Sequence, residues 1–404
     1  MRPSARAGSP TGLAIIAGIC GSLDSVLNIA FPDLTDDLNL PVDRIGLIIV
    51  SYVGVFGLGL VPAGRLVDRR GGRLTIAIGG FVTVAGLALA ATATGLPSLL
   101  IGRIVQGAGT AMVMAAAPSL LTRTAGPDAQ GRALGMLQTS TGVGLTLGPL
   151  IGGLIVASWG WRAVFGLRIP LFVLLVVIAV ATAEPRTAPT DQRVPLGPIL
   201  RNGAFIRANL ANLIASGAAF AVFIFGPSYM VDELGASELV GGIVLALWAG
   251  ALALVSPVAG RLTDRHDPGP AAMGGLGLLV VGLVIGAVAS SVSSLSLLAA
   301  SSLVTGAGLG LFTVANMTFV MGSLDQEHQG VAGGITLTMR TIGLLASVGV
   351  LTLVFNTFGD ADVGRGLTAT FIAAAIATFG AIAVSRRRPD LVGTPDTTID
   401  RPSA

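Results

Sequence analysis

One heptapeptide recurs in the chain with a single substitution, first as Ala63-Gly64-Arg65-Leu66-Val67-Asp68-Arg69 and again, 196 residues later, as Ala259-Gly260-Arg261-Leu262-Thr263-Asp264-Arg265. Two further stretches repeat at an offset of 199. Gly107-Ala108-Gly109 matches Gly306-Ala307-Gly308, and Asp128-Ala129-Gln130-Gly131 matches Glu327-His328-Gln329-Gly330. Three matches at nearly one offset predict two halves that contain the same elements in the same order.

The composition around these repeats is that of a membrane protein. Of the 404 residues, 52% are hydrophobic and only 11% are charged, whereas soluble domains carry about 25% charged residues. So few charges do not cover the surface of a soluble protein of this length. The 24 basic residues are all arginines and are dispersed along the chain, which argues against a nucleic-acid-binding surface.

Twelve apolar segments are long enough to span a bilayer, which takes about 20 mostly apolar residues. They lack the period-two alternation of barrel strands. We therefore predict an all-α polytopic membrane protein with twelve transmembrane helices in two six-helix halves. The segments cover residues 11–32, 45–63, 73–94, 97–120, 131–156, 162–183, 204–230, 238–260, 271–291, 294–320, 330–356 and 366–385.

The long polar interruption near the middle of the chain is rich in proline and arginine, which is typical of a linker. We predict an N-terminal six-helix half at residues 1–183, a cytoplasmic linker at 184–203, a C-terminal six-helix half at 204–385 and a cytoplasmic tail at 386–404. No small-residue cleavage site follows the first apolar run, so we expect that run to be a retained helix rather than a signal peptide.

The arginines indicate the orientation. With the N-terminus inside, 18 of the 24 arginines fall on the cytoplasmic side and four on the outer side. Cytoplasmic loops of membrane proteins carry an excess of Arg and Lys. We therefore expect a multi-pass protein of the cell (plasma) membrane, the inner membrane of a bacterium, with both termini in the cytoplasm.

Two motifs in the first half carry a family resemblance. Gly64-Arg65-Leu66-Val67-Asp68-Arg69-Arg70-Gly71-Gly72-Arg73 resembles the signature G-x-L-x-D-R-x-G-R-[RK] of the major facilitator superfamily, with one extra glycine, and Arg103-Ile104-Val105-Gln106-Gly107 resembles that family's helix-4 motif R-x-x-Q-G. The resemblance covers essentially the whole chain. It implies a secondary transporter that binds its substrate between two halves and works by alternating access.

A third motif resembles that of exporters in the same superfamily. Residues 144–153 fit the helix-5 pattern G-x-x-x-G-P-x-x-G-G. Small residues let helices approach closely, and a proline permits a bend. The motif residues are Gly144, Gly148, Pro149, Gly152 and Gly153.

Two shorter stretches resemble drug:proton antiporters, mostly of a fourteen-helix branch. Leu23–Pro32 resembles the helix-1 signature of these antiporters, and Arg340-Thr341-Ile342-Gly343 resembles a late-helix motif. The chain departs from that branch in having twelve predicted helices. It also has Arg168-Ile169-Pro170 where the branch commonly has Asn-x-Pro.

The resemblance assigns the repeated loop to switching between inward- and outward-facing states. Asp68 and Asp264 each precede an apolar run, where a carboxylate can cap a helix N-terminus. We expect Arg65, Arg69 and Arg132 to pair with these carboxylates. The alternative is ordinary charge pairing in solvated loops, which contributes little. The predicted switching residues are Gly64, Arg65, Asp68, Arg69, Arg132, Asp264 and Arg265.

Two charges at similar depth in helices 1 and 4 suggest a coupling site, formed by Asp24 and Arg103. A charge within a membrane helix costs at least about 2.5–3.5 kcal/mol, and protonation of Asp24 relieves that cost. We predict that these two residues interact and couple transport to protons. The alternatives are a structural hydrogen bond between Asp24 and Asn28, and a purely structural role for Arg103.

Five residues are predicted to line the substrate cavity. Arg340, near the middle of helix 11, either contacts an anionic or hydroxylated substrate or forms a structural pair between the halves. The aromatic candidates either offer surface to a substrate or face lipid. Arg168 is expected in the outer third of helix 6, with its side chain extended toward the membrane surface. The predicted cavity residues are Asn28, Gln106, Arg340, Tyr52 and Phe223.

The leading hypothesis is a secondary active transporter that exports small amphiphilic compounds, such as drugs or natural products, in exchange for protons. The alternative is an importer or facilitator of a small metabolite in the same fold. A receptor on a transporter scaffold would not need the buried charges. The sequence contains no G-x-x-x-x-G-K-[ST] loop and no nucleophile–base constellation, so we predict neither an ATP-driven pump nor an enzyme.

The predicted energy source is the proton gradient, and we predict no cofactor and no metal site, because the chain has one cysteine and two histidines. The predicted partners are the small-molecule substrate, protons and the lipid bilayer, without nucleic acid. Nothing in the sequence requires more than a monomer.

Overall fold

The computed structural model describes residues 10–38, 40–41, 44–181, 196–221, 226, 229–324, 326–359 and 362–386. Those residues are almost entirely helical, and each of the twelve predicted segments contains a helix. The first half contains α1 (Pro10–Ser22), η1 (Leu23–Val26), α2 (Leu27–Asp37), α3 (Ile45–Arg70), α4 (Gly72–Ala91), α5 (Leu96–Ala125), η3 (Pro127–Ala129), α6 (Gln130–Trp159), α7 (Trp161–Gly166) and α8 (Ile169–Ala181).

The second half repeats this arrangement. It contains α9 (Leu196–Arg201), α10 (Gly203–Ala219), η4 (Tyr229–Glu233), α12 (Glu238–Arg265), α13 (Pro268–Ser291), α14 (Leu295–Gly322), η5 (Gln326–His328), α15 (Gln329–Gly359) and α16 (Val363–Arg386). The short helix α9 lies within the predicted linker. Residues 182–195 and 387–404 lie outside the described part, so the linker and tail boundaries stay predictions.

Most of these helices match the bilayer in length and composition. Among the described residues, nine helices are long and apolar enough to cross a membrane when α7 and α8 are counted together as Trp161–Ala181, and α6 is a tenth if its two bent parts form one span. The parts of α6, Gln130–Pro149 and Ile151–Trp159, meet at 42°. Pro149 explains this bend, because a proline inside a helix removes one backbone hydrogen bond and displaces the preceding turn.

Two spans that the sequence predicts as continuous are interrupted. The first span contains the 3₁₀ turn η1 between α1 and α2, and the sixth span has a break at Leu167 and Arg168 between α7 and α8. Serine hydroxyls accompany the first interruption: Ser22 donates to the carbonyl oxygen of Ile19 at 2.9 Å, and Ser25 donates to that of Ser22 at 2.9 Å. Such bonds compete with the helical pattern and distort it locally.

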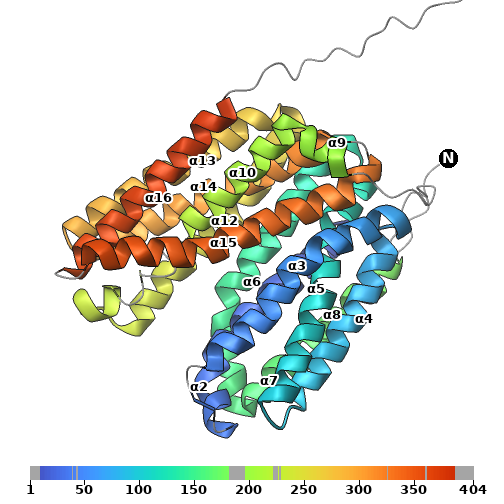
Figure 1. Cartoon of the computed structure of the whole chain (residues 1–404), viewed down its shortest axis with the longest axis horizontal. Helices are drawn as coiled ribbons and strands as arrows, with labels where there is room; N and C mark the ends of the chain where they lie inside the picture. Colours follow the sequence, from blue (N-terminus) through green and yellow to red (C-terminus); the bar gives the residue numbers. More distant parts are fainter. Residues whose placement is uncertain are drawn as a thin grey trace, which may run out of the picture.

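The helices form two groups with separate cores. One buried core lies among α1–α8 and includes Phe165 and Phe172, and another lies among α10–α16 and includes Phe312 and Phe371. The groups contact each other mainly where α3 packs on α15 and where α6 packs on α12. Figure 1 shows the two groups meeting near α9 and separating toward α2 and α7.

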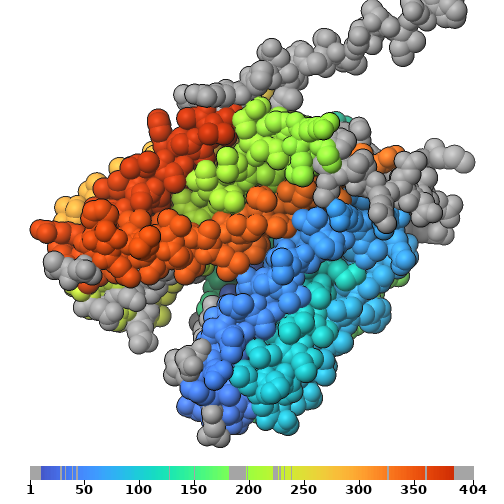
Figure 2. Space-filling model, viewed as in Figure 1, coloured from blue at the N-terminus to red at the C-terminus, as the bar shows by residue number. Residues whose placement is uncertain are grey.

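The end near α9 is tightly packed, and we call it the closed end. Gly64 and Gly330 approach each other there at the α3–α15 crossing, and Gly131 and Gly260 do so at the α6–α12 crossing. These pairs are equivalent under the repeat, because Gly64 matches Gly260 and Gly131 matches Gly330. The opposite end, which carries α2 and α7, we call the open end, because Figure 2 shows a notch between the groups on that side.

Candidate functional site

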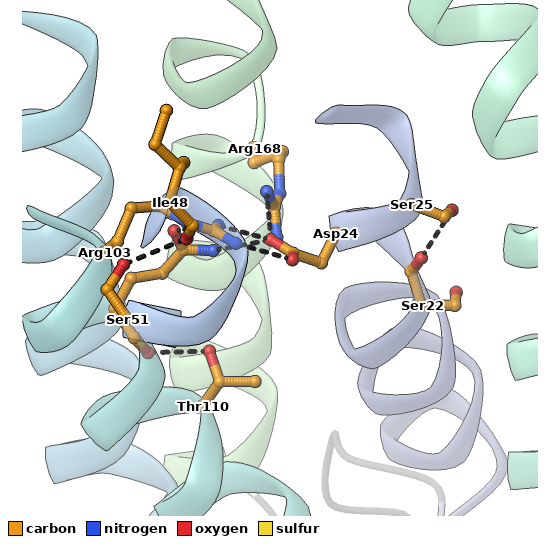
Figure 3. Close-up of polar contacts among 9 residues, drawn as sticks. Ser22, Asp24, Ser25, Ile48, Ser51, Arg103, Thr110 and Arg168 are labelled. Atoms are coloured by element: carbon orange, nitrogen blue, oxygen red, sulfur yellow. Dashed lines mark hydrogen bonds and ion pairs between the residues drawn. The ribbon is translucent and has the colours of Figure 1, made fainter. Parts of the chain in front are cut away.

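Asp24 lies in η1, where the first span is interrupted, and its side chain is 22% exposed. The interruption brings its carboxylate against side chains from the fourth and sixth spans, and Tyr52 of the second span packs on one of them. Figure 3 shows the arginines from the fourth and sixth spans both directed at this carboxylate. We call Asp24, Tyr52, Arg103, Gln106 and Arg168 the Asp24 cluster.

Arg103 of α5 binds both oxygens of Asp24. Its Nη1 donates to Oδ1 at 2.7 Å and its Nη2 donates to Oδ2 at 2.9 Å. Gln106 accepts a bond from Arg103 at 2.9 Å and donates to Asp24 at 3.2 Å. The ring of Tyr52 lies 4.2 Å from the guanidinium carbon of Arg103, which is 1% exposed. A bidentate pair of this kind fixes both distance and orientation.

Arg168 also belongs to this cluster, although its sequence position predicts a place in the outer third of helix 6. Instead of extending toward the membrane surface, it is 4% exposed, and its Nη1 lies 3.3 Å from Oδ1 of Asp24. Its Nε and Nη2 have no partner among the described residues. The break between α7 and α8 turns the side chain inward. The only signal in the sequence was the arginine at a position where the related branch commonly has asparagine.

The Asp24 cluster combines one carboxylate with two guanidinium groups, so it carries one net positive charge when Asp24 is ionised. Protonation of Asp24 would leave two positive charges without a counter-ion. Removing one partner of a buried ion pair typically costs about 3–5 kcal/mol, because the other charge stays buried and uncompensated. A proton on Asp24 therefore favours a structure in which Arg103 and Arg168 have moved.

The helix-5 glycines connect this cluster to the interface between the halves. They lie four residues apart on α6, so they form one stripe along the helix. Gly153 lies off this stripe and is half-buried. An added Cβ on the stripe would meet the segment that carries Asp24: Gly144 lies against Ser22, Gly148 against Ser25 and Gly152 against Val26.

Replacing Gly144 with alanine should disrupt this contact. The new methyl group would overlap the Ser22 side chain, and such overpacking typically costs about 1–3 kcal/mol. We expect transport to fall by at least about tenfold, a change equivalent to roughly 1.4 kcal/mol, while the protein still inserts and folds. Substrate transport and circular dichroism measure the two effects.

The matched control is Gly380→Ala on α16, an exposed glycine whose added Cβ would meet no atom within 4 Å. We expect this variant to transport like the wild type. Equal activity of Gly144→Ala and Gly380→Ala would contradict the role of the stripe.

A cavity of about 230 Å³ lies between the two groups of helices. Its walls come from α1, α3, α5 and α6 on one side and from α10, α14 and α15 on the other. Most of its lining is apolar and includes Phe56, Met114, Leu137, Met317 and Leu337. A cavity formed by both groups can change its shape when they move relative to each other.

The structure divides the predicted cavity residues. Arg340 lines the cavity, whereas Tyr52 and Gln106 do not and belong to the Asp24 cluster instead. Phe223 and the side chain of Asn28 lie outside the described residues. Tyr52 stacks on Phe56, with 6.0 Å between ring centroids, so the aromatic pair extends from the cluster to the cavity wall.

Asp68 binds across the closed end. It lies within α3, not in a loop, and accepts hydrogen bonds from the backbone N–H groups of Gly330 at 2.7 Å and Val331 at 2.8 Å. These groups form the N-terminal turn of α15, whose partial positive charge favours a carboxylate. The capped helix therefore belongs to the other half, whereas sequence analysis expected the helix that follows Asp68. Arg123 lies 3.7 Å from the same carboxylate.

Asp264 makes the equivalent contact at the N-terminus of α6. It accepts bonds from the backbone N–H groups of Gly131 at 2.6 Å and Arg132 at 3.2 Å, and from Nε of Arg132 at 2.9 Å. The predicted partner Arg132 is thus present. No ion pair joins Arg65 or Arg69 to Asp68 within the described residues; the cation beside Asp68 is Arg123, which sequence analysis missed.

The contacts of Asp68 and Asp264 are equivalent under the internal repeat. A comparison with known protein families agrees with the resemblance that the motifs carry. The model of the Major Facilitator Superfamily matches residues 13–348 and residues 208–397. The chain belongs to this superfamily. Its relatives include the tetracenomycin C resistance and export protein of Streptomyces glaucescens, with 27% identity over 87% of this chain and 77% of that protein.

Two further relatives of this superfamily member differ in the function that their names state. One is the multidrug resistance protein Stp of Mycobacterium tuberculosis, with 23% identity over 84% of this chain and 74% of the relative. The other is the riboflavin transporter RibZ of Clostridioides difficile, with 23% identity over 79% of this chain and 81% of the relative.

Solved structures confirm the superfamily fold. The fucose:proton symporter FucP of E. coli matches with a TM-score of 0.76 and 17% identity over 94% of this chain and 98% of that one. An outward-facing bacterial homologue of ferroportin matches with a TM-score of 0.77 and 14% identity over 94% and 99%. The prediction of twelve helices in two halves is confirmed. The protein is a membrane transporter of small molecules and not an enzyme.

Proposed function

We propose that this transporter exports small amphiphilic compounds in exchange for protons. The observation that carries the proposal is the position of Asp24: a titratable carboxylate, held by two arginines, lies on the segment that the glycine stripe joins to α6. Because α6 packs on α12 of the other half, a change of charge at Asp24 acts on a helix of the interface. The export named for one relative and the multidrug resistance named for another support the direction.

The proposed orientation places the closed end in the cytoplasm. Asp68, Arg123, Arg132 and Asp264 lie at that end, together with the described arginines at the ends of α3 and α12 and at the start of α4. The excess of arginine on one side follows the positive-inside rule. The state described here is then open to the outside of the plasma membrane, and both termini lie in the cytoplasm.

The proposed cycle uses protonation of Asp24 as its coupling step. A proton enters from the open end and neutralises Asp24, and Arg103 and Arg168 lose the charge that holds them. The rearrangement moves η1 against the glycine stripe and shifts α6 relative to α12. The contacts of Asp68 and Asp264 then open, and the substrate site becomes accessible from the cytoplasm. Release of the proton inside restores the cluster, and the protein returns with its substrate.

Efflux from cells tests this proposal. Cells that express the protein are loaded with a panel of fluorescent and antibiotic compounds, and efflux is measured with and without a protonophore. We expect at least one amphiphilic compound to leave faster than from cells with an empty vector. The protonophore should reduce that efflux to the empty-vector rate, because it dissipates the gradient that drives exchange.

The alternative, an importer or facilitator of a small metabolite, has support from the riboflavin transporter among the relatives. Efflux that persists with the protonophore would indicate a facilitator. Protein-dependent uptake of the same compounds would indicate an importer. Either result would contradict the proposed exchange.

A further inference from the structure

We infer that the transported compound is an amphiphilic anion whose acidic group binds Arg340. This inference rests on the proposed function, because it specifies the substrate class of the cavity between the halves. The starting observation is the charge of the cavity wall. Of the described residues that line it, Arg340 is the one with a charged side chain.

The guanidinium group of Arg340 is available to a ligand. The structure assigns it no hydrogen bond and no ion pair among the described residues. The cost of leaving an uncompensated cation in a membrane is about 2.5–3.5 kcal/mol on insertion scales. A carboxylate or phenolate in the cavity would supply the missing counter-ion, and arginine binds carboxylates through two parallel hydrogen bonds.

A second donor faces the same cavity from the other half. Gln138 of α6 lines the cavity, and its buried Nε2 has no hydrogen-bond partner among the described residues. Buried polar groups are normally hydrogen-bonded, so such a group indicates a missing acceptor. Arg340 and Gln138 lie on α15 and α6, and an acceptor that reaches both would join the two halves.

Three of the four threonines that line the cavity add no further donor. The hydroxyl groups of Thr141, Thr336 and Thr341 donate to carbonyl oxygens of their own helices at 2.9 Å. The free donors of the described wall are therefore those of Arg340 and Gln138, with the hydroxyl group of Thr313 and the side-chain amide of Asn316, and Arg340 is the one that carries a charge. The rest of the wall offers the apolar surface of Phe56 and its neighbours. This combination matches an apolar molecule with one acidic group.

The Asp24 cluster supplies no free negative charge to a ligand in the cavity. Its carboxylate is already bound by Arg103, Arg168 and Gln106, so it offers no free counter-ion to a cationic drug. Cluster and cavity together contain three arginines and one aspartate. A cationic ligand would meet repulsion from Arg340 without any compensating acid in the described lining.

Binding of three matched probes tests the substrate class. The purified full-length protein in lipid nanodiscs is dialysed at neutral pH against 1-naphthoate, 1-naphthamide or 1-naphthylmethylammonium, with empty nanodiscs as the blank. These probes share one aromatic body and differ in charge. We expect the carboxylate to bind at least about tenfold more tightly than the amide, the lower bound for hydrogen bonds to a charged group, and the ammonium to bind more weakly than the amide.

Two variants assign the preference to Arg340. Arg340→Gln should lower the affinity for naphthoate to that for naphthamide and leave the affinity for naphthamide unchanged, which also shows that the cavity is intact. Arg340→Lys should retain part of the preference, because lysine keeps the charge and loses the planar fork. A Gln138→Leu variant should weaken naphthoate binding less than Arg340→Gln.

Several outcomes would overturn the inference. Equal binding of the three probes, tighter binding of the ammonium probe, or no binding of any probe would exclude an anion site. A carboxylate preference that persists in Arg340→Gln would place the site elsewhere. The assay measures equilibrium binding without a pH gradient, so it does not depend on the direction of transport. A failure of proton exchange or of export would therefore leave this result unchanged, and the two proposals can fail independently.

Discussion

Replacing Asp24 with asparagine is expected to abolish transport driven by a pH gradient. Asparagine retains the shape of the side chain and one acceptor oxygen, but it does not gain or lose a proton. Uphill transport into proteoliposomes with an imposed gradient should fall to the level of protein-free vesicles. Exchange of substrate at equal concentration and equal pH should continue, because it does not require a change of charge at Asp24.

The variant also leaves Arg103 and Arg168 without a full counter-ion, so its stability needs a control. The double variant Asp24→Asn with Arg168→Gln removes one of the two stranded cations. We expect it to recover thermal stability relative to the single variant without recovering uphill transport. Uphill transport by either variant would show that the coupling proton binds at another group.

Replacing Asp68 with asparagine is expected to open the closed end and slow transport. The two carboxylate oxygens accept from the N–H groups of Gly330 and Val331, and an amide offers only one acceptor and directs a donor at the other N–H. Hydrogen bonds to charged groups contribute about 1.5–3 kcal/mol. Loss of one such bond shifts the balance between the two states by roughly 10- to 150-fold.

Distances between spin labels at the closed end measure this shift. Labels at Arg70 and Glu327, both exposed, report on α3 and on the segment that precedes α15. The buried Cys20 is replaced by alanine so that only the introduced cysteines carry a label. The population with the longer distance should increase in Asp68→Asn and not in Asp128→Asn, which removes an exposed carboxylate on the same face. An unchanged distance distribution in Asp68→Asn, together with slower transport, would contradict a role in closure.

The fold was predictable because its determinants are local or repeated. Long apolar runs require helices in a bilayer, where every backbone polar group needs an internal partner. The repeat of residues 63–69 at 259–265 then predicted two equivalent halves. The breaks at Asp24 and Arg168 were not predictable from hydropathy, because both lie within otherwise apolar runs. Serine hydroxyls accompany the first break, and the contact between Arg168 and Asp24 accompanies the second.

The site was predictable only in part. Deep charges need partners, so the pairing of Asp24 with Arg103 is predictable, and the structure brings them together at 2.7 Å. Arg168 was assigned to the outer side, because sequence does not show that a helix break turns its side chain inward. Tyr52 was assigned to the cavity, because an aromatic beneath a guanidinium and an aromatic beside a substrate have the same sequence signal.

The contacts of Asp68 and Asp264 show a further limit. Their type was anticipated, since a carboxylate near a helix N-terminus is favourable. The helix that each carboxylate binds was not predictable, because it lies in the opposite half. The partner is more than 130 residues away in the sequence for Asp264 and more than 260 residues away for Asp68. Only the arrangement of the halves decides which N-terminus each carboxylate meets.

The central claim is that substrate and protons move in opposite directions through a step at Asp24. Proton movement in proteoliposomes, followed with a pH-sensitive dye trapped inside, tests it most directly when the exported compound from the efflux panel is added on one side. The account predicts substrate-dependent proton counterflow with the wild type and none with Asp24→Asn. Wild-type substrate transport without proton movement, or equal proton counterflow in Asp24→Asn, would contradict it.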